Sequence, residues 1–177
     1  GITTDSQDNI YVTGSTYDGS LDNYYTIKYD SNGTKIWNRT YNGGGWDYAY
    51  GITTDSQDNI YVTGESPGSD QNYYTIKYDS NGTKIWNRTF DGGDDDRASA
   101  ITVDLQDNIY VTGYSQNESR EDYYTIKYDS SSDQIWNKTH NGFNQDRANG
   151  IAIDSNNNVI VVGQSDTNSS CIQFNCN

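Results

Sequence analysis

The sequence contains no methionine, one proline, one histidine and only two leucines among its 177 residues. Leu, Ile, Val and Phe together make 28 residues, about 16% of the chain, which is below the roughly 20% that separates folded from disordered composition when net charge is high. Basic residues are also scarce, because 11 Lys and Arg stand against 25 Asp and Glu. Composition alone therefore predicts a disordered chain, and only the order of the residues argues otherwise.

These shortages exclude several classes of function. A net charge of −14 and an isoelectric point near 4.1 repel phosphate backbones, so we expect no nucleic-acid partner. The longest aliphatic run is Val159 to Val162, far shorter than the ~18 apolar residues of a membrane-spanning helix. We therefore expect no membrane insertion. No signal peptide is visible, and a chain that opens on Gly1 without methionine indicates a processed product or a fragment.

The sequence is dominated by an internal repeat. GITTDSQDNIYVTG occurs at residues 1–14 and again, unchanged, at 51–64, and YYTIKYDSNGTKIWNRT occurs at 24–40 and again at 73–89. A third copy is looser, and a fourth begins like the others before losing the pattern. The equivalent isoleucines, spaced by 50, 49 and 50 residues, are Ile2, Ile52, Ile101 and Ile151. We predict one domain, 1–177, made of repeats at about 1–50, 51–99, 100–149 and a partial 150–177.

A finer period predicts strands joined by hairpin turns. In the segment 24–29, Tyr25 and Ile27 share one face while Thr26 and Lys28 share the other, and this alternation is typical of a β-strand. Turn-forming aspartates recur every 24 or 25 residues between such segments. They are Asp5, Asp30, Asp55, Asp79, Asp104, Asp129 and Asp154. The pattern predicts an all-β chain with two hairpins in each full repeat.

Four strands per repeat of about 50 residues are typical of β-propeller blades. We predict blades of four antiparallel strands, with three full repeats and a partial fourth. Because aliphatic residues are few, aromatic side chains must supply much of the contact between blades. One tryptophan recurs in each full repeat, and we expect these residues to fill the seams: Trp37, Trp86 and Trp136.

A longer motif resembles a known repeat. The pattern D-Y/R-A-x-G/A-I-x-x-D-x-x-x-N-x-Y/V-V-x-G is found at 47–64, 96–113 and 146–163, and it is similar to the bacterial and archaeal β-propeller repeat SBBP. The resemblance implies a propeller fold and a secreted or surface-attached protein, and it carries no catalytic residues. In this chain the turn reads Gln-Asp-Asn or Asn-Asn-Asn where the family usually has a glycine.

The partial fourth repeat leaves its geometry open. It supplies two clear strands and a candidate third at 171–174, so the chain forms either a minimal four-bladed ring or an open arc. In both cases a blade edge lacks its last strand, and unpaired edges and uncovered blade faces favour association. We expect head-to-tail contact between copies of the chain, which builds a filament if the rotation does not close. The alternatives are a fragment of a larger propeller and an adhesin-like module that binds glycans or proteins.

Candidate modification sites are numerous. Asn-x-Ser/Thr sequons, the acceptors of N-glycans in secreted proteins, occur at Asn32, Asn38, Asn81, Asn87, Asn117, Asn137 and Asn168. Of these, Asn38, Asn87 and Asn137 share one repeat position on the expected outermost strand. In an extracellular chain, Cys171 and Cys176 are candidates for a disulfide.

No catalytic, cofactor or metal site is predicted. His140 is the only histidine and has no counterpart in the other repeats, which disfavours a Ser-His-Asp group. The acidic stretch at 91–96 offers oxygen ligands for Ca²⁺, but only Asp96 recurs, as Asp47 and Asp146, and a recurring aspartate is typical of a turn or strand cap. We therefore expect a non-enzymatic, extracellular or cell-surface structural protein.

Overall fold

The computed structural model describes residues 1–117, 120–142 and 145–165 in full and the backbone of 171–174. The described residues form strands in four antiparallel sheets and no helix. Sheet 1 contains β1 (Ile2–Thr4), β2 (Ile10–Tyr17), β3 (Asp22–Tyr29) and β4 (Lys35–Tyr41). Sheet 2 contains β5 (Tyr48–Thr54), β6 (Ile60–Pro67), β7 (Gln71–Tyr78) and β8 (Lys84–Phe90).

The other two sheets follow the same plan. Sheet 3 contains β9 (Asp96–Val103), β10 (Ile109–Asn117), β11 (Arg120–Tyr128) and β12 (Gln134–His140). Sheet 4 contains β13 (Arg147–Ile153), β14 (Val159–Gln164) and β15 (Cys171–Phe174). Within every sheet the strands pair in chain order, which confirms the blade topology predicted from the repeat.

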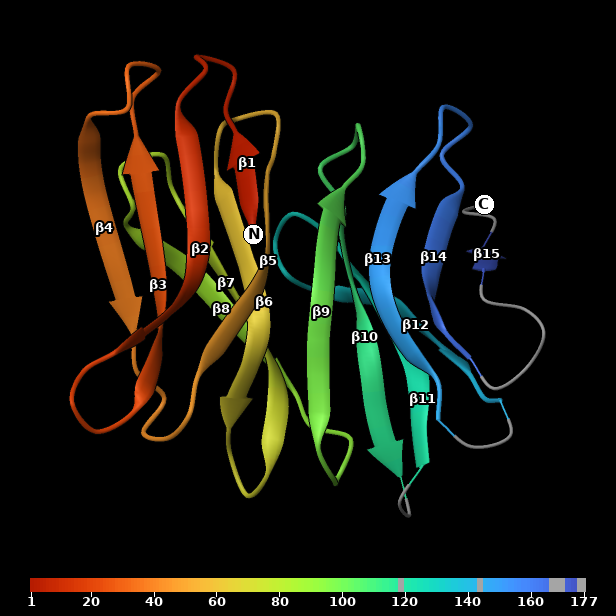
Figure 1. Cartoon of the computed structure of the whole chain (residues 1–177). Coiled ribbons are helices and arrows are strands. Elements are labelled where there is room, and N and C mark those ends of the chain that lie inside the picture. Colours follow the sequence, from red (N-terminus) through yellow and green to blue (C-terminus); the bar gives the residue numbers. More distant parts are fainter. Residues whose placement is uncertain (118–119, 143–144, 166–170, 175–177) are drawn as a thin grey trace.

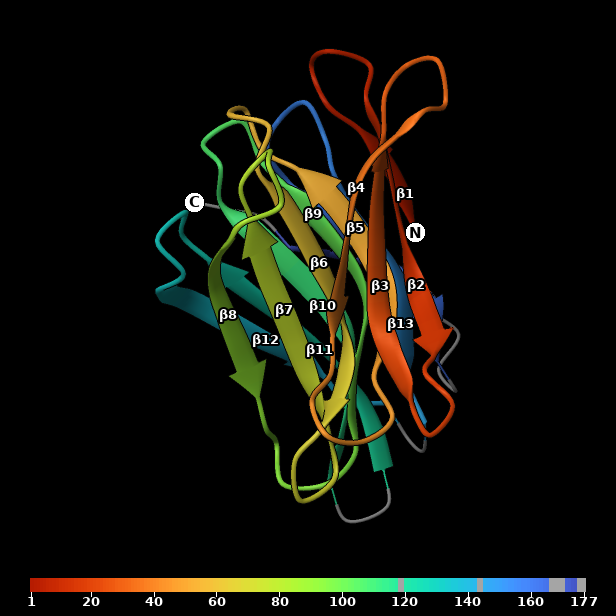
Figure 2. The same cartoon turned by 90° about the vertical axis from the view of Figure 1, so that its left-hand side faces the viewer.

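The sheets stand in a row that does not close into a ring. In Figure 1 sheets 1 and 4 lie at opposite ends, with sheets 2 and 3 between them. The first strand of each sheet is the innermost: β1, β5, β9 and β13 lie next to one another, and each of the last three also contacts further strands of the preceding sheet. Figure 2 views this stack from the side of sheet 1. Of the two geometries that the sequence allowed, the structure has the open arc.

The partial fourth repeat forms a third strand where the sequence suggested one. In β15, Ile172 pairs with Val161 as Ile27 pairs with Val12 in sheet 1. The segment Cys-Ile-Gln-Phe therefore takes the place that Thr-Ile-Lys-Tyr has in the complete repeats. The match gives a physical reason why a segment with little visible similarity still forms a strand, because Ile172 keeps a β-branched residue at the position that pairs with Val161.

A buried carboxylate organises the first turn of each full repeat. In sheet 2, Asp55 Oδ1 accepts hydrogen bonds from the backbone N–H groups of Gln57 (3.0 Å) and Asn59 (2.8 Å). Its Oδ2 accepts from the Asn59 amide and from the Tyr61 hydroxyl, both at 2.9 Å, and lies 3.3 Å from Lys77 Nζ. Because a buried charge is costly unless it is paired and hydrogen-bonded, this dense set of donors is what permits an acid at that position.

The same arrangement lowers the pKa of the equivalent residue in sheet 1, Asp5. Burial raises the pKa of Asp5, but hydrogen bonds from Asn9, Tyr11 and Gln7 outweigh that effect and lower the pKa to about 2. Lys28 Nζ lies 3.4 Å from its Oδ2. Asp104 has the same kinds of partner, and its pKa is also lowered. These turns therefore favour the ionised carboxylate.

Stability should fall in acid because of these carboxylates. The folded-state pKa of Asp5 lies below the unfolded value of 3.8, so its contribution is complete above about pH 4 and is lost as the pH falls through about 2, a loss of about 2 kcal/mol. Asp5→Asn should lower the unfolding free energy at pH 7 and flatten its dependence between pH 4 and pH 2, as measured by urea titration.

The matched control is Asp30→Asn in the β3–β4 turn. There a single carboxylate oxygen accepts two backbone N–H groups, and an asparagine oxygen can keep both. An acid dependence that is equally steep in wild type and Asp5→Asn would show that this carboxylate does not stabilise the fold.

Candidate functional site

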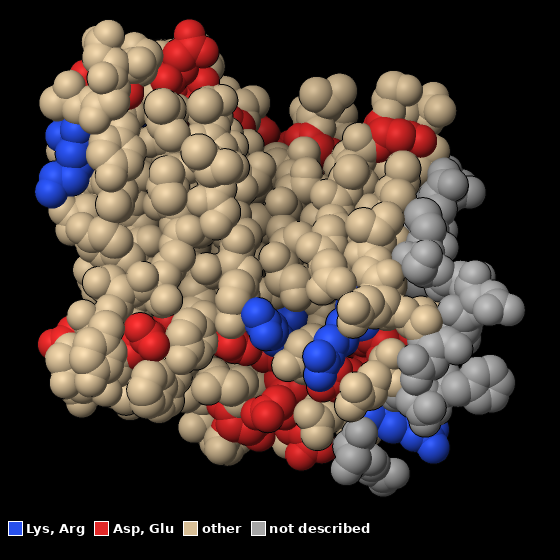
Figure 3. Space-filling model, in the orientation of Figure 1, with Lys and Arg blue, Asp and Glu red and all other residues tan. Residues whose placement is uncertain are grey.

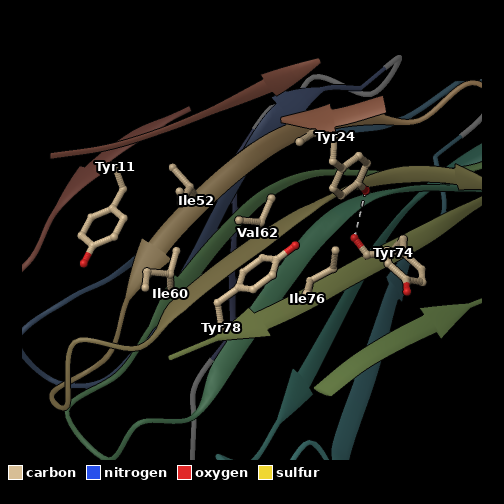
Figure 4. Close-up of a cluster of buried hydrophobic side chains, with 9 residues drawn as sticks. Tyr11, Tyr24, Ile52, Ile60, Val62, Tyr74, Ile76 and Tyr78 are labelled. Atoms are coloured by element: carbon tan, nitrogen blue, oxygen red, sulfur yellow. Dashed lines mark hydrogen bonds between the residues drawn. The ribbon is translucent and has the colours of Figure 1, made fainter. Parts of the chain in front are cut away.

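Neighbouring sheets meet through two chemically different faces. We define the leading face of a sheet as the one that carries the tyrosines equivalent to Tyr11 and Tyr24, and the receiving face as the one against which the preceding leading face packs. In the first seam the buried residues of the receiving face of sheet 2 are Ile52, Ile60, Val62, Tyr74, Ile76 and Tyr78. Figure 4 shows Tyr11 and Tyr24 of sheet 1 beside these side chains.

Aromatic rings and hydrogen bonds tie the two faces together. Tyr41 of β4 stacks on Tyr74 of β7 with ring centroids 4.3 Å apart. The Tyr24 hydroxyl donates to the Tyr74 carbonyl at 3.1 Å, the contact marked in Figure 4. The second seam repeats both features: Phe90 stacks on Tyr124 at 4.2 Å, and the equivalent tyrosine hydroxyl of sheet 2 donates to the Tyr124 carbonyl. The seam is therefore a recurring structural unit.

A hydrogen-bonded clasp joins the turns of adjacent sheets. Asp58 and Asp107 have φ angles of 62° and 61°, a left-handed conformation that aspartate tolerates better than most residues. Asp58 accepts hydrogen bonds from the backbone N (2.9 Å) and the hydroxyl (2.8 Å) of Ser6. Asp107 accepts the same pair from Ser56, at 2.9 and 2.7 Å. A glycine could form this turn but not the clasp, which gives a physical reason for the aspartate.

The third seam lacks the serine of the clasp. Leu105 stands at the position of Ser6 and Ser56, and it is 95% exposed. The facing residue in sheet 4 is Asn157, again in the left-handed conformation with φ of 64°. A hollow of about 590 Å³ lies between the two turns, with Val103 and Ile153 among its walls. The third seam is consequently more open at this end.

The receiving face of sheet 1 is covered by no described residue of a preceding blade. Ile2 is 71% exposed, whereas its equivalents Ile52 and Ile101 are each 8% exposed. The remaining residues of this face are half-buried, while their equivalents in sheet 2 are buried: Ile10, Val12, Tyr25, Ile27 and Tyr29. Sheet 1 therefore presents to its surroundings the same side chains that sheets 2 and 3 use to bind a neighbouring sheet.

The recurring tryptophans lie at the seams. Trp37, Trp86 and Trp136 are partly buried and pack against the clusters of the first, second and third seam respectively. The Trp37 indole N–H donates to the carbonyl of Ser80 in sheet 2 at 3.2 Å. Each tryptophan also contacts the leading-face tyrosine of its own sheet, as in the pair Tyr11–Trp37 with ring centroids 5.8 Å apart.

The sequons occupy turns and outer strands. Asn38 and Asn87 are half-buried on β4 and β8, and Asn137 is exposed on β12. Three others are exposed in turns or at a strand end: Asn32, Asn81 and Asn117. Asn168 lies outside the described residues. So does Cys176, while Cys171 begins β15 and only its backbone is described.

The acidic residues at 91–96 and His140, which the sequence offered as site candidates, make local hydrogen bonds and ring contacts. The Asp96 carboxylate accepts a hydrogen bond from the Gly92 N–H, and Asp95 accepts one from the Gln71 N–H at 3.1 Å. Burial raises the pKa of Asp96, although hydrogen bonds from Ser115 and Gly92 oppose it. His140 forms an edge contact with Tyr123 at 5.8 Å. Within the described part of the chain, no three His, Cys, Asp or Glu side chains are grouped to hold a metal ion.

The described part of the chain contains no helix that is long and apolar enough to cross a bilayer.

Comparisons with known proteins support the propeller architecture. The profile of SBBP, a beta-propeller repeat, matches residues 1–22, 39–70 and 91–119. No curated protein matches the chain. Among solved structures, the chain is similar to a protein of unknown function from Bacteroides caccae, with a TM-score of 0.61 over 98% of this chain at 11% identity. The match covers 55% of that protein, so this chain spans about half its length, and the likeness concerns the fold alone.

Restoring the missing clasp should strengthen the third seam. The double variant Leu105→Ser/Asn157→Asp recreates the Ser–Asp pair of the other seams, and because Leu105 is 95% exposed its removal sacrifices little burial. We expect a gain of about 1 kcal/mol, seen as a higher midpoint of thermal unfolding by circular dichroism. The reciprocal variant Ser56→Leu should lower the midpoint by removing the hydroxyl hydrogen bond of the second clasp. Unchanged midpoints in both variants would contradict a stabilising role for the clasp.

Proposed function

We propose that this chain, in which SBBP β-propeller repeats match residues 1–22, 39–70 and 91–119, is a non-enzymatic structural protein of the cell exterior that associates with further copies of itself. The contact is head to tail, between the receiving face of sheet 1 in one copy and the leading face of sheet 4 in the next. The observation that carries the proposal is the exposure of Ile2 and its neighbours, whose equivalents in sheets 2 and 3 are buried by a preceding sheet.

The chemistry of the two faces is complementary. The leading face of sheet 4 presents the aliphatic side chains of Ile160 and Val162, the second of which is 43% exposed. Burying aliphatic surface against the receiving face of sheet 1 is favourable at roughly 25 cal/mol per Å². Ile160 stands where the other sheets have a tyrosine, so this contact uses smaller side chains than the internal seams.

Both halves of a clasp are also present on these surfaces. Asp8, exposed on sheet 1, is the equivalent of Asp58 and Asp107, and its φ is 62°. Ser155, exposed on sheet 4, is the equivalent of Ser6 and Ser56. A head-to-tail contact brings this serine to the Asp8 carboxylate in the manner of the two internal clasps. A contact of this heterologous type propagates, because each copy keeps one free surface of each kind.

A structural role agrees with the way the carboxylates are used. The buried aspartates hold turns, the left-handed aspartates hold clasps, and the strand-preceding aspartates bind backbone N–H groups. The sequons at Asn38, Asn87 and Asn137 lie on the outer strands and support a location outside the cell, because N-glycans are carried by secreted proteins.

Mixing two face variants tests the head-to-tail contact. Ile2→Asp places a charge on the receiving face of sheet 1, and Val162→Asp places one on the leading face of sheet 4. Each variant alone should be a monomer of 19.9 kDa, whereas the wild type should form larger species, as measured by size-exclusion chromatography with light scattering. An equimolar mixture should form a dimer and nothing larger, because only one intact pair of faces remains.

The matched control is Ile36→Asp, which changes a 52% exposed isoleucine on β4 outside both faces, and it should assemble like the wild type. A wild-type protein that stays at 19.9 kDa at high concentration would refute the proposal. Dimers of Val162→Asp on its own would instead indicate symmetric pairing of two receiving faces, and would refute the head-to-tail geometry.

Glycosylation gives a separate test of the proposed location. When the chain is produced through a secretory pathway that adds N-glycans, we expect a mass increase that Asn137→Gln reduces by one glycan, because Asn137 is exposed on an outer strand. Intact-protein mass spectrometry measures the change. A secreted chain that carries no glycan would count against the proposed location outside the cell.

A further inference from the structure

A hollow of about 300 Å³ is lined mainly by the innermost strands β5, β9 and β13, away from the receiving face of sheet 1. Its walls come from sheets 2, 3 and 4, and they include Tyr50, Arg97, Ser99, Tyr114, Arg147 and Asn149. The volume lies at the lower end of the range for small-molecule sites, roughly 300–1,000 Å³. Figure 3 shows this side of the molecule, where basic side chains in the lower half lie beside acidic ones.

The repeats differ from one another at this hollow, whereas the turn aspartates and the leading-face tyrosines recur in all three full repeats. The position of Tyr50 is taken by Ser99 in sheet 3 and by Asn149 in sheet 4. The neighbouring strand is equally varied, since Tyr114 pairs with Arg97 where the equivalent pair in sheet 4 is Gln164 with Arg147. The hollow therefore combines different polar groups from three sheets, which a purely structural repeat does not require.

Two arginines are held in place by rings and carboxylates. The Arg97 guanidinium lies 4.0 Å from the ring centroid of Tyr50, and the Tyr50 hydroxyl donates to Glu65 Oε1 at 2.6 Å. Arg97 Nε is 3.9 Å from Glu65 Oε2, too far for a hydrogen bond. Its side chain is 40% exposed. Arg97 is thus oriented by its neighbours while its N–H donors remain accessible.

The second arginine is fixed more tightly. Arg147 donates to both oxygens of Glu121, through Nε and through Nη2 (2.6 Å for the latter). Its guanidinium also lies 5.3 Å from the ring centroid of Tyr114. This bidentate pair is a rigid planar group, and with 45% of the arginine side chain exposed it leaves the remaining Nη1 donors for a ligand.

The charges around the hollow compensate one another. Each arginine has a glutamate beside it, Glu65 for Arg97 and Glu121 for Arg147, and the whole chain carries a net charge of −14. An anionic ligand therefore gains little net attraction here. A neutral ligand rich in hydroxyl groups suits the site better, because hydroxyls can both donate to carboxylates and amide oxygens and accept from guanidinium and amide N–H groups.

We infer that this hollow binds a neutral carbohydrate. The guanidinium groups and the Asn149 amide supply planar hydrogen-bonding partners for sugar hydroxyls, Ser99 supplies a hydroxyl, and Tyr50 and Tyr114 in the lining supply apolar contact for the C–H surface of a sugar ring. The site size corresponds to a short saccharide unit, and its position on the inner strands leaves the receiving face of sheet 1 free.

Immobilised neutral oligosaccharides of glucose, galactose, mannose and N-acetylglucosamine test the inference, with uronic-acid oligosaccharides in the same panel. The wild-type protein should bind at least one neutral member. Arg97→Gln should weaken that binding about tenfold, the effect of losing hydrogen bonds from a charged donor. Asn149→Ala should also weaken it. Both variants should keep the thermal unfolding midpoint of the wild type, because the residues are half-buried or exposed.

Lys138→Gln is the matched control, since it removes one positive charge from an exposed site on the outer strand β12, and it should bind like the wild type. Failure to bind any neutral saccharide would overturn the inference. Equal affinities of Arg97→Gln and Lys138→Gln for the bound saccharide would place the ligand elsewhere. Preferential, salt-sensitive binding of the uronic-acid members would show that the arginines act as an anion site, and would overturn the assignment to neutral sugars.

Discussion

Burial of aliphatic side chains beneath tyrosine rings is the interaction on which the rest of the structure depends. The chain has few Leu, Ile, Val and Phe residues, so no single sheet can bury a core of its own. Neighbouring sheets therefore form a common core. In the first seam, Ile60, Val62 and Ile76 of sheet 2 are covered by Tyr11 and Tyr24 of sheet 1. Tyrosine suits this task because its ring buries a large apolar area while its hydroxyl still needs a partner. The Tyr24 hydroxyl donates a hydrogen bond to the Tyr74 carbonyl across the seam. One side chain therefore buries apolar area and also fixes the position of one sheet relative to the next.

This dependence between sheets connects the fold to the proposed function. A sheet that needs a neighbour to bury its receiving face presents an attachment surface wherever no neighbour is present, and sheet 1 shows such a surface around Ile2. The innermost strands are freer to vary, because their side chains toward the hollow lie outside the buried hydrophobic clusters of the seams. Arg97 and Arg147 occupy that freer region. The molecule thus separates a constant packing surface, which would mediate assembly, from a variable surface, which would bind a ligand.

Much of the fold could be predicted from the sequence, because the repeat fixes both strand alternation and turn position. The turn carboxylate Asp55 and the pairing of β15 both follow from patterns within about 30 residues. The clasp could not be predicted, because the sequence indicates only a turn at Asp58 and its partner Ser6 lies 52 residues away on another sheet. The open arc could not be predicted either, since the angle between sheets depends on how side chains such as Tyr41 and Tyr74 pack. The hollow has no motif because its residues come from three repeats that differ there.

The clasp also bears on how such a protein can change in length. A stretch of about 50 residues carries the serine for the next seam and the left-handed aspartate for the previous one, together with both packing faces. A gene segment of that length can be duplicated or deleted, and the flanking blades still meet matching partners. The third seam differs, because Leu105 stands there at the position of the clasp serine. An inserted blade would therefore fit less well at the third seam than at the first or the second. Insertion of further blades is easiest in the first half of the chain.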